Sequence, residues 1–125
     1  MRVAFTSSDG RTIDRHFGQV STFDVWEVGP DAAGFVEHVS AVTSGEDEED
    51  RTTARATAVA GCAIVYTVQI GGPAAAKLVA RRIHPMKTGA EVAIADVVSK
   101  LQEVMRGTPP PWLRKAMGGA IREEA

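Results

Sequence analysis

The chain has 125 residues, of which 44% are hydrophobic and 24% are charged, and its formal net charge is −2. This mix is ordinary for one globular domain and excludes a disordered or fibrous chain. There is no basic excess to hold phosphates and no apolar run near the roughly 20 residues that cross a bilayer, so we expect neither nucleic acid nor membrane as a partner.

The cysteine content and the first residues indicate the compartment. The single cysteine, Cys62, can form neither an internal disulfide nor a zinc site of four thiolates. Residues 1–6 resemble a strand and lack the apolar core of a signal peptide. We therefore expect a reducing, cytoplasmic location.

The first third of the chain predicts three strands, over residues 2–6, 22–28 and 35–42. The last two are joined by a short turn, so we expect them to pair antiparallel. Residues 7–21 lack a clear period, which is unusual in a compact domain unless the segment is functional or contains a short hairpin. Asp9-Gly10 is a candidate turn for such a hairpin.

Helices and strands alternate in the middle of the chain. The acidic run Glu46–Asp50 predicts the start of a helix that reaches about Ala60 and ends at Gly61, because carboxylates stabilise a first turn and glycine suits the position after a last turn. Residues 63–68 are continuously apolar, which is typical of a buried parallel strand. Gly71-Gly72-Pro73 then predicts the start of a second helix.

The last third predicts a fifth strand over residues 83–87, where Pro85 favours a sheet edge, and a third helix over 91–105. Residues 108–111 cannot continue that helix. The predicted order is β-β-β-α-β-α-β-α, which is an α/β fold with a five-stranded mixed sheet flanked by helices. We expect residues 1–107 to form this domain and 108–125 a C-terminal Pro/Trp segment and tail, with Trp112-Leu113 as a packing anchor or partner contact.

His16 is the first candidate binding residue. It lies in the long segment beside Phe17-Gly18, where an imidazole could reach a ligand with little obstruction by the backbone. Imidazole is a good ligand for iron. The alternative is a surface histidine bonded to a nearby carbonyl.

The end of the apolar strand is the second candidate region. Thr67 closes that strand and Gly71-Gly72 opens the following helix, the usual place for a ligand in an open α/β sheet and for an anion at free amides. A tight turn without a ligand is the alternative. Lys87 ends the fifth strand at the same edge and could offset negative charge.

Cys62 and His84 are further candidate metal ligands, each with a simpler structural interpretation. Cys62 opens the strand that we expect to be the parallel neighbour of the first strand. Four or five residues at about 3.3 Å each place it roughly 15 Å from His16, which argues against a shared metal. His84 precedes a proline on an edge strand and is interpreted first as structural. The aspartates Asp9, Asp14 and Asp24 have no special spacing, so a metal-dependent hydrolase is a weak alternative.

Five segments are more specific together than any is alone: Val3–Gly10, Asp14-Arg15-His16-Phe17-Gly18, Ile70–Ala75, Ile83-His84-Pro85-Met86-Lys87 and Pro110-Pro111-Trp112-Leu113. In this order they resemble the NifX-type family of nitrogen-fixation proteins, whose relatives include the carrier domain of NafY and the C-terminal domain of NifB. The resemblance covers residue 2 to about residue 117.

The resemblance implies a ribonuclease-H-like fold and a role in assembling the iron–molybdenum cofactor of nitrogenase. It implies a protein that is not an enzyme, needs no organic cofactor, and binds an iron–sulfur precursor made by NifB that it can pass to the NifEN scaffold. His16 matches the histidine implicated in cluster binding in the carrier relatives. Some relatives carry a second cysteine where this chain has Thr67.

A small number of protein ligands suits such a carrier. A precursor rich in sulfide needs few protein ligands, and each added ligand would slow its release. One imidazole, several amides and Lys87 would hold an anionic cluster reversibly. We expect the acidic run Glu46–Asp50 to lie away from this site. A docking or storage module that uses Trp112-Leu113 and ligates no cluster is the alternative function.

Overall fold

The apolar runs of the sequence become neighbouring strands of one sheet. The structure is a computed structural model that describes residues 1–43, 45 and 47–124, with side chains to residue 118. Its main sheet has the order β4-β3-β1-β5-β6. The strands are β1 (Arg2–Phe5), β3 (Thr22–Val28), β4 (Ala33–Ser40), β5 (Ile64–Thr67) and β6 (His84–Lys87).

Four α-helices, one 3₁₀ helix and a second, two-stranded sheet complete the described fold. They are α1 (Glu48–Ala58), α2 (Gly72–Ala80), α3 (Ile94–Arg106), α4 (Pro111–Glu124), η1 (Phe17–Gln19), β2 (Thr12–Ile13) and β7 (Val92–Ala93). None of the described helices is both long and apolar enough to cross a membrane.

The strand directions confirm the predicted mixed sheet. β1 is parallel to β5 and β5 is parallel to β6, whereas β3 is antiparallel to both β1 and β4. Pro85 lies on β6 at the edge of the sheet, as predicted, where its missing N–H costs little. The carboxyl ends of β1, β5 and β6 therefore meet at one edge.

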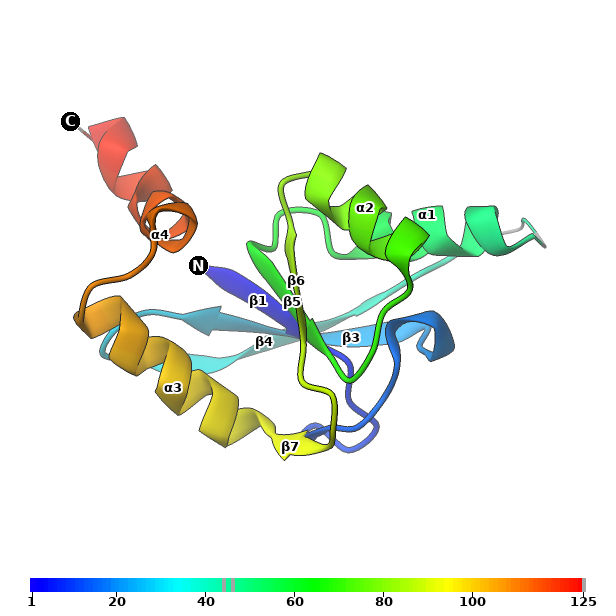
Figure 1. Ribbon diagram of the computed structural model, residues 1–125, viewed down its shortest axis with the longest axis horizontal. Coiled ribbons are helices and arrows are strands. Elements are labelled where there is room, and N and C mark those ends of the chain that lie inside the picture. Colours follow the sequence, from blue (N-terminus) through cyan, green and yellow to red (C-terminus); the bar gives the residue numbers. More distant parts are fainter. Residues whose placement is uncertain (44, 46, 125) are drawn as a thin grey trace.

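The alternation of side chains along the strands divides the core into two layers. One cluster contains Phe5, Tyr66 and Leu101 and lies on the face covered by α3 and α4. The other contains Val65 and Leu78 and lies on the face covered by α1 and α2. Figure 1 shows α3 and α4 to one side of the sheet and α1 and α2 to the other.

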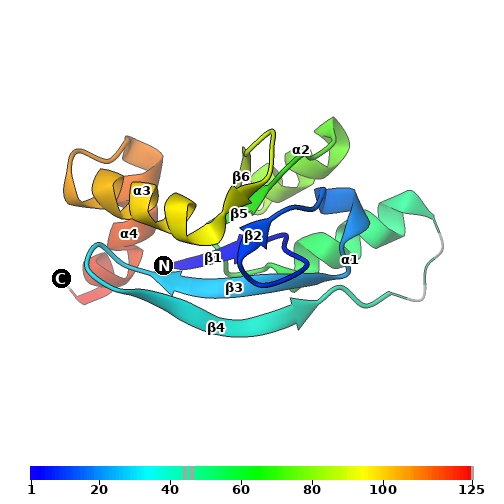
Figure 2. The same ribbon diagram turned by 90° about the horizontal axis from the view of Figure 1, so that it is seen from below.

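The hairpin predicted at Asp9-Gly10 is wrong, although the turn itself is present. The Asp9 carboxylate accepts the Arg11 and Thr12 amides at 2.8 Å each, and Gly10 has a φ of +78°. The strand that follows, β2, pairs with β7 instead of returning to β1 (Figure 2). Because Val92–Ala93 form that strand, the third helix begins at Ile94 and not at residue 91.

The C-terminal segment contains a helix that the predicted order lacked. Pro111 opens α4, because proline suits a first helical position even though it cannot continue the preceding helix. Leu113 is 1% exposed and belongs to the core cluster that α3 also enters. Trp112 and Met117 pack against the same cluster, so the first turns of α4 share the core of the rest of the chain.

The acidic run begins α1, as predicted. Asp47 caps the helix by accepting the Asp50 amide at 2.7 Å, and Glu48, Glu49 and Asp50 lie in the first turn, where carboxylates stabilise a helix. Glu46 lies outside the described residues.

Candidate functional site

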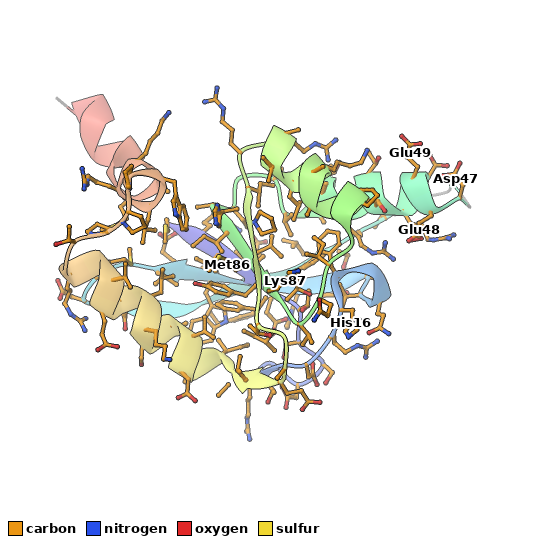
Figure 3. All side chains as sticks on the ribbon, viewed as in Figure 1. His16, Asp47, Glu48, Glu49, Met86 and Lys87 are labelled. Atoms are coloured by element: carbon orange, nitrogen blue, oxygen red, sulfur yellow. The ribbon has the colours of Figure 1, made fainter. Side chains whose placement is uncertain are left out.

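The backbone on either side of His16 is bonded to the segment that leaves β5. The Arg15 carbonyl accepts the Val68 amide at 3.1 Å, and the Phe17 amide donates to the Gln69 carbonyl at 2.9 Å. His16 itself is exposed and precedes η1. The predicted juxtaposition of His16 with the exit of this strand is therefore present in the fold (Figure 3).

Two buried threonines hold the same loop from beneath. The Thr6 and Thr67 hydroxyl oxygens lie 3.0 Å apart and are 2.8 and 3.1 Å from the Arg15 carbonyl oxygen. Both residues are 0% exposed. Thr67 therefore cannot touch a ligand at the surface, which corrects its expected contact role. We interpret it as a residue that positions His16.

Phe17 anchors the loop in the core directly beside the exposed imidazole. Its side chain is 1% exposed, and its ring centroid is 5.6 Å from that of Phe23. It belongs to the same cluster as Ala74, in the first turn of α2. The His16 loop and the start of α2 therefore lie on the same face of the sheet.

The start of α2 presents free backbone donors. Gly71 caps the helix without a side-chain hydrogen bond, and Pro73 has no N–H. The Gly72 and Ala74 amides belong to the first turn, which has no partners within the helix. Such amides, at the positive end of the helix, favour an anion.

Three glycines leave open space around this region. A Cβ added at Gly18, Gly71 or Gly72 would meet no atom within 4 Å outside its own chain neighbours, and none of the three has a positive φ. Neither backbone strain nor crowding therefore requires glycine there. A missing side chain at these positions leaves the backbone accessible to a bound molecule.

Lys87 lies at the same edge and on the same face. It pairs in register with Thr67, while the preceding pair, Tyr66 and Met86, belongs to the opposite core cluster. Alternation therefore directs Thr67 and Lys87 toward the α2 face. The Thr88 amide donates to the Thr67 carbonyl at 2.8 Å, so the chain after Lys87 is bonded to the exit of β5 as well.

We call the group formed by His16, Gly71, Gly72 and Lys87 the His16 surface. Its charged member is the Lys87 ammonium, on an exposed side chain. Figure 3 shows Asp47, Glu48 and Glu49 at the tip of α1, apart from His16 and Lys87. This placement agrees with the expectation that the acidic run lies away from the site.

Cys62 and His84 lie at the opposite end of the strands. Cys62 is 5% exposed, and burial raises the pKa of its thiol, so the thiolate that binds metals is disfavoured. The His84 ring stacks on Trp112 with centroids 3.9 Å apart, and burial lowers the pKa of His84. Neither shares a metal with His16, and no group of three His, Cys, Asp or Glu side chains in the described part of the chain could hold a metal ion.

The aspartates that suggested a hydrolase are each engaged separately. Asp9 accepts backbone amides in its own turn, Asp14 accepts the Ser8 amide at 2.9 Å, and Asp24 lies 2.8 Å from His38 Nδ1. Among the described residues they form no metal-binding group. The three aspartates therefore do not form the metal site that a metal-dependent hydrolase would need.

Sequence reasoning missed the supporting residues of the His16 surface. Thr6 is predicted only as the end of the first strand, and no role is predicted for Gln69. A threonine at the end of an otherwise apolar strand is the signal that could have identified Thr6, because a buried hydroxyl needs a hydrogen-bond partner. The Gln69 contact uses only backbone atoms, so side-chain chemistry gives no signal for it.

Comparisons with known proteins identify the family. Residues 1–104 match the family model described as dinitrogenase iron-molybdenum cofactor. The chain is 43% identical to a NifX protein of Herbaspirillum seropedicae, over 94% of this chain and 82% of the relative. It is 39% identical to one of Sinorhizobium fredii, over 96% and 79%. It is also 27% identical to the FeMo cofactor biosynthesis protein NifB of Bradyrhizobium diazoefficiens, over 88% of this chain and 25% of that protein.

A solved structure shares the fold. The crystal structure of PH0822 superposes with a TM-score of 0.65 and 23% identity, covering 82% of this chain and 91% of that one. It supports the α/β architecture described above. Taken with the family match and the NifX relatives, these findings show that the chain belongs to the dinitrogenase iron–molybdenum cofactor family, as a NifX-type member with a role in the biosynthesis of that cofactor.

Proposed function

We propose that this chain is a non-catalytic carrier that holds an iron–sulfur precursor of the iron–molybdenum cofactor on the His16 surface. It accepts the precursor from a NifB-type protein and passes it to a NifEN-type scaffold. One observation carries the proposal: an exposed imidazole is held by backbone hydrogen bonds beside a helix start that has no side-chain cap, at the carboxyl edge of the sheet.

Each part of the His16 surface makes a different interaction with an anionic cluster. The His16 ring nitrogen donates an electron pair to one iron atom, which is the direct bond in the complex. The Gly72 and Ala74 amides and the Lys87 ammonium offset the negative charge of the sulfide-rich cargo. A single bond from the protein leaves the other iron sites to the cluster's own sulfides, so release needs only one ligand exchange.

The main alternative is a docking or storage module that never ligates the cluster. Its expected contact, Trp112-Leu113, is engaged within the chain, since Leu113 is buried in the core and Trp112 stacks on His84. Leu113 is thus a packing residue, whereas Trp112 is only half-buried. The carrier function uses residues that are exposed and accessible, which is why we favour it.

Anaerobic titration with the isolated precursor, followed by visible absorption, tests the proposal. His16→Gln removes the imidazole and should weaken binding about tenfold or more, a loss of about 1.4 kcal/mol. His38→Gln is the matched control, because His38 is the other strongly exposed imidazole, with 63% of its side chain accessible, and Gln can still donate to Asp24. Equal affinity in the His16 variant and the wild type would remove His16 from the role.

A second measurement tests whether the chain transfers the precursor and whether it catalyses any reaction. Loaded chain is mixed with the NifEN-type scaffold and the two are separated by gel filtration under anaerobic conditions. The carrier function predicts that iron moves to the scaffold in a one-to-one exchange without chemical change in the cargo. Turnover of the cargo by the chain alone, or of phosphoester substrates with magnesium or manganese, would contradict a non-catalytic carrier.

A further inference from the structure

Two adjoining hollows lie at the amino-terminal end of β1, β5 and β6, opposite the His16 surface. One, of about 650 Å³, is lined by Arg82, His84, Trp112 and Lys115 among others. The second, of about 460 Å³, adds Arg81 and shares Ala63, Arg82 and Ala116 with the first. Together they form an elongated trench between α2 and α4, which flank the N-terminus in Figure 1.

Positive charge gathers along this trench without compensation. Arg81, Arg82 and Lys115 have no ion pair or hydrogen bond to any side chain that the structure describes. The neighbouring cations differ in this respect, since the Met1 amino group pairs with Glu27 at 2.6 Å and Arg2 pairs with Glu37. A chain with a net charge of −2 thus presents, in one place, three cations that pair with no described side chain, although Glu27 also lines the smaller hollow.

The backbone conformation of Arg82 is unfavourable for a residue other than glycine, which indicates that its guanidinium has a role apart from folding. Arg82 has a φ of +62°, and within the described chain it is the one residue other than glycine with a positive φ. It follows the end of α2, where the Arg82 amide donates to Val79 at 2.9 Å and the Ile83 amide to Leu78 at 3.0 Å. Glycine is favoured at such a position, and another residue costs about 1 kcal/mol or more.

The walls of the trench combine these cations with apolar surface. Val79 is 60% exposed and lines the larger hollow together with the Trp112 ring. One face of Trp112 is covered by His84 and the side chain also packs against the core, so it offers little stacking surface to a nucleotide base. Cations beside apolar surface, spread over two adjoining hollows, fit a peptide with acidic and apolar side chains better than a compact anion.

We propose that this trench, defined by Arg81, Arg82, Trp112 and Lys115, binds an acidic segment of a partner protein that also presents apolar side chains. A second copy of this chain fits less well. Two carboxylates of its acidic run are already engaged within their own helix, since Asp47 accepts the Asp50 amide and Glu48 pairs with Arg51 and Arg55. Such a head-to-tail contact would also propagate from copy to copy.

The position of the trench indicates how docking would assist the chain, an inference that rests on the proposed carrier function. The His16 surface lies at the carboxyl end of the strands and the trench at their amino end. A partner held in the trench leaves the cargo uncovered. The chain can therefore stay docked to an assembly protein while its cluster is loaded or removed.

Fluorescence anisotropy with a short labelled peptide of alternating Glu and Leu tests the trench. We expect the double variant Arg82→Glu, Lys115→Glu to bind it about tenfold more weakly than the wild type, with a steep loss of binding at high salt. Lys100→Glu on α3 is the matched control for charge reversal and should bind normally. Arg82→Gly should weaken binding while its melting temperature stays equal or rises, because the strain at φ +62° is relieved.

Three results with the peptide or polyphosphate would overturn the proposal. They are no binding of the acidic peptide to the wild type, equal binding by the double variant, and equally tight binding of inorganic polyphosphate, which would indicate a general anion surface. Concentration-dependent self-association that the double variant loses would also overturn it, in favour of a second copy. Precursor binding in the same double variant separates the two functions, because it should persist whether or not the peptide binds.

Discussion

The two ends of the parallel strands are built differently. At the carboxyl end, the His16 surface consists of one imidazole, one lysine and the glycines and free amides at the start of α2, and backbone hydrogen bonds to the exit of β5 fix its place. At the amino end, the trench consists of long cationic side chains and a stacked aromatic pair.

This difference matches two kinds of recognition. A metal cluster needs an electron-pair donor at a fixed place and close approach to the backbone, which small residues allow. A partner protein needs area and charge, which long side chains supply. If the comparison is right, a change at one end should leave the function of the other end intact.

The largest effect is expected when α4 is detached from the core. Leu113→Ala removes a side chain that is 1% exposed and should lower the free energy of unfolding by about 2–5 kcal/mol. Because α4 carries one wall of the trench, peptide binding should fall while precursor binding persists. Denaturant unfolding measures the first effect, and Val104→Ala, at a position 41% exposed on α3, should change stability much less.

The next effect concerns the support of the His16 loop. Thr67→Val keeps the shape of the side chain but removes the hydroxyl that reaches the Arg15 carbonyl, and should cost about 1–3 kcal/mol. Precursor binding should weaken as well, because the loop is less fixed. A double-mutant cycle with Thr6→Val should show coupling between the two threonines. Thr57→Val, on the exposed surface of α1, serves as the control, and additive effects of Thr6 and Thr67 would contradict a shared network.

A smaller effect is expected at Lys87. Lys87→Gln should weaken precursor binding by about threefold to fivefold, since an exposed charge contributes at most about 1 kcal/mol. High salt should remove the difference between variant and wild type. The same substitution at Lys115, at the other end of the strands, should leave precursor binding unchanged. Equal losses for the two lysines would mean that only net charge matters.

The smallest effect is a pH dependence at the trench. Burial lowers the pKa of His84 from its ordinary value of 6.5, so the folded chain prefers the neutral ring and the unfolded chain takes up the proton first. The stabilisation is complete above pH 6.5 and is lost as the pH falls through the lower pKa of the folded state. The melting temperature should therefore fall between a pH above 6.5 and a pH well below it, and this fall should be larger for the wild type than for His84→Phe. An unchanged difference in that variant would assign the pH dependence to another group.

Most of the main sheet could be predicted because its signals are local. The continuous apolar run of β5 indicated a buried parallel strand, and Pro85 indicated an edge, and both are confirmed. The β2–β7 pair was missed because each strand has two residues and their partners are about 80 positions apart in the chain. α4 was missed because its glycines and the preceding prolines weaken the helical signal.

The residue types of the candidate site could be predicted, but the contacts that hold them in place could not. An imidazole beside glycine and a helix start after an apolar strand are visible in the sequence, and the fold brings them to one edge. The contacts that hold them there join residues 15 and 17 to residues 68 and 69 through backbone atoms. Every residue has those atoms, so only the three-dimensional structure shows that Thr67 is buried beneath the His16 loop and bonded to the Arg15 carbonyl.

Detection of the iron–nitrogen bond is the most direct test of the carrier function. Chain grown with ¹⁵N-labelled histidine is loaded with the precursor in a paramagnetic oxidation state and studied by pulsed electron paramagnetic resonance. The carrier function predicts a coupled histidine nitrogen in the wild type and in His38→Gln, and none in His16→Gln. A nitrogen coupling that survives in His16→Gln, or its absence from a fully loaded wild-type chain, would contradict it.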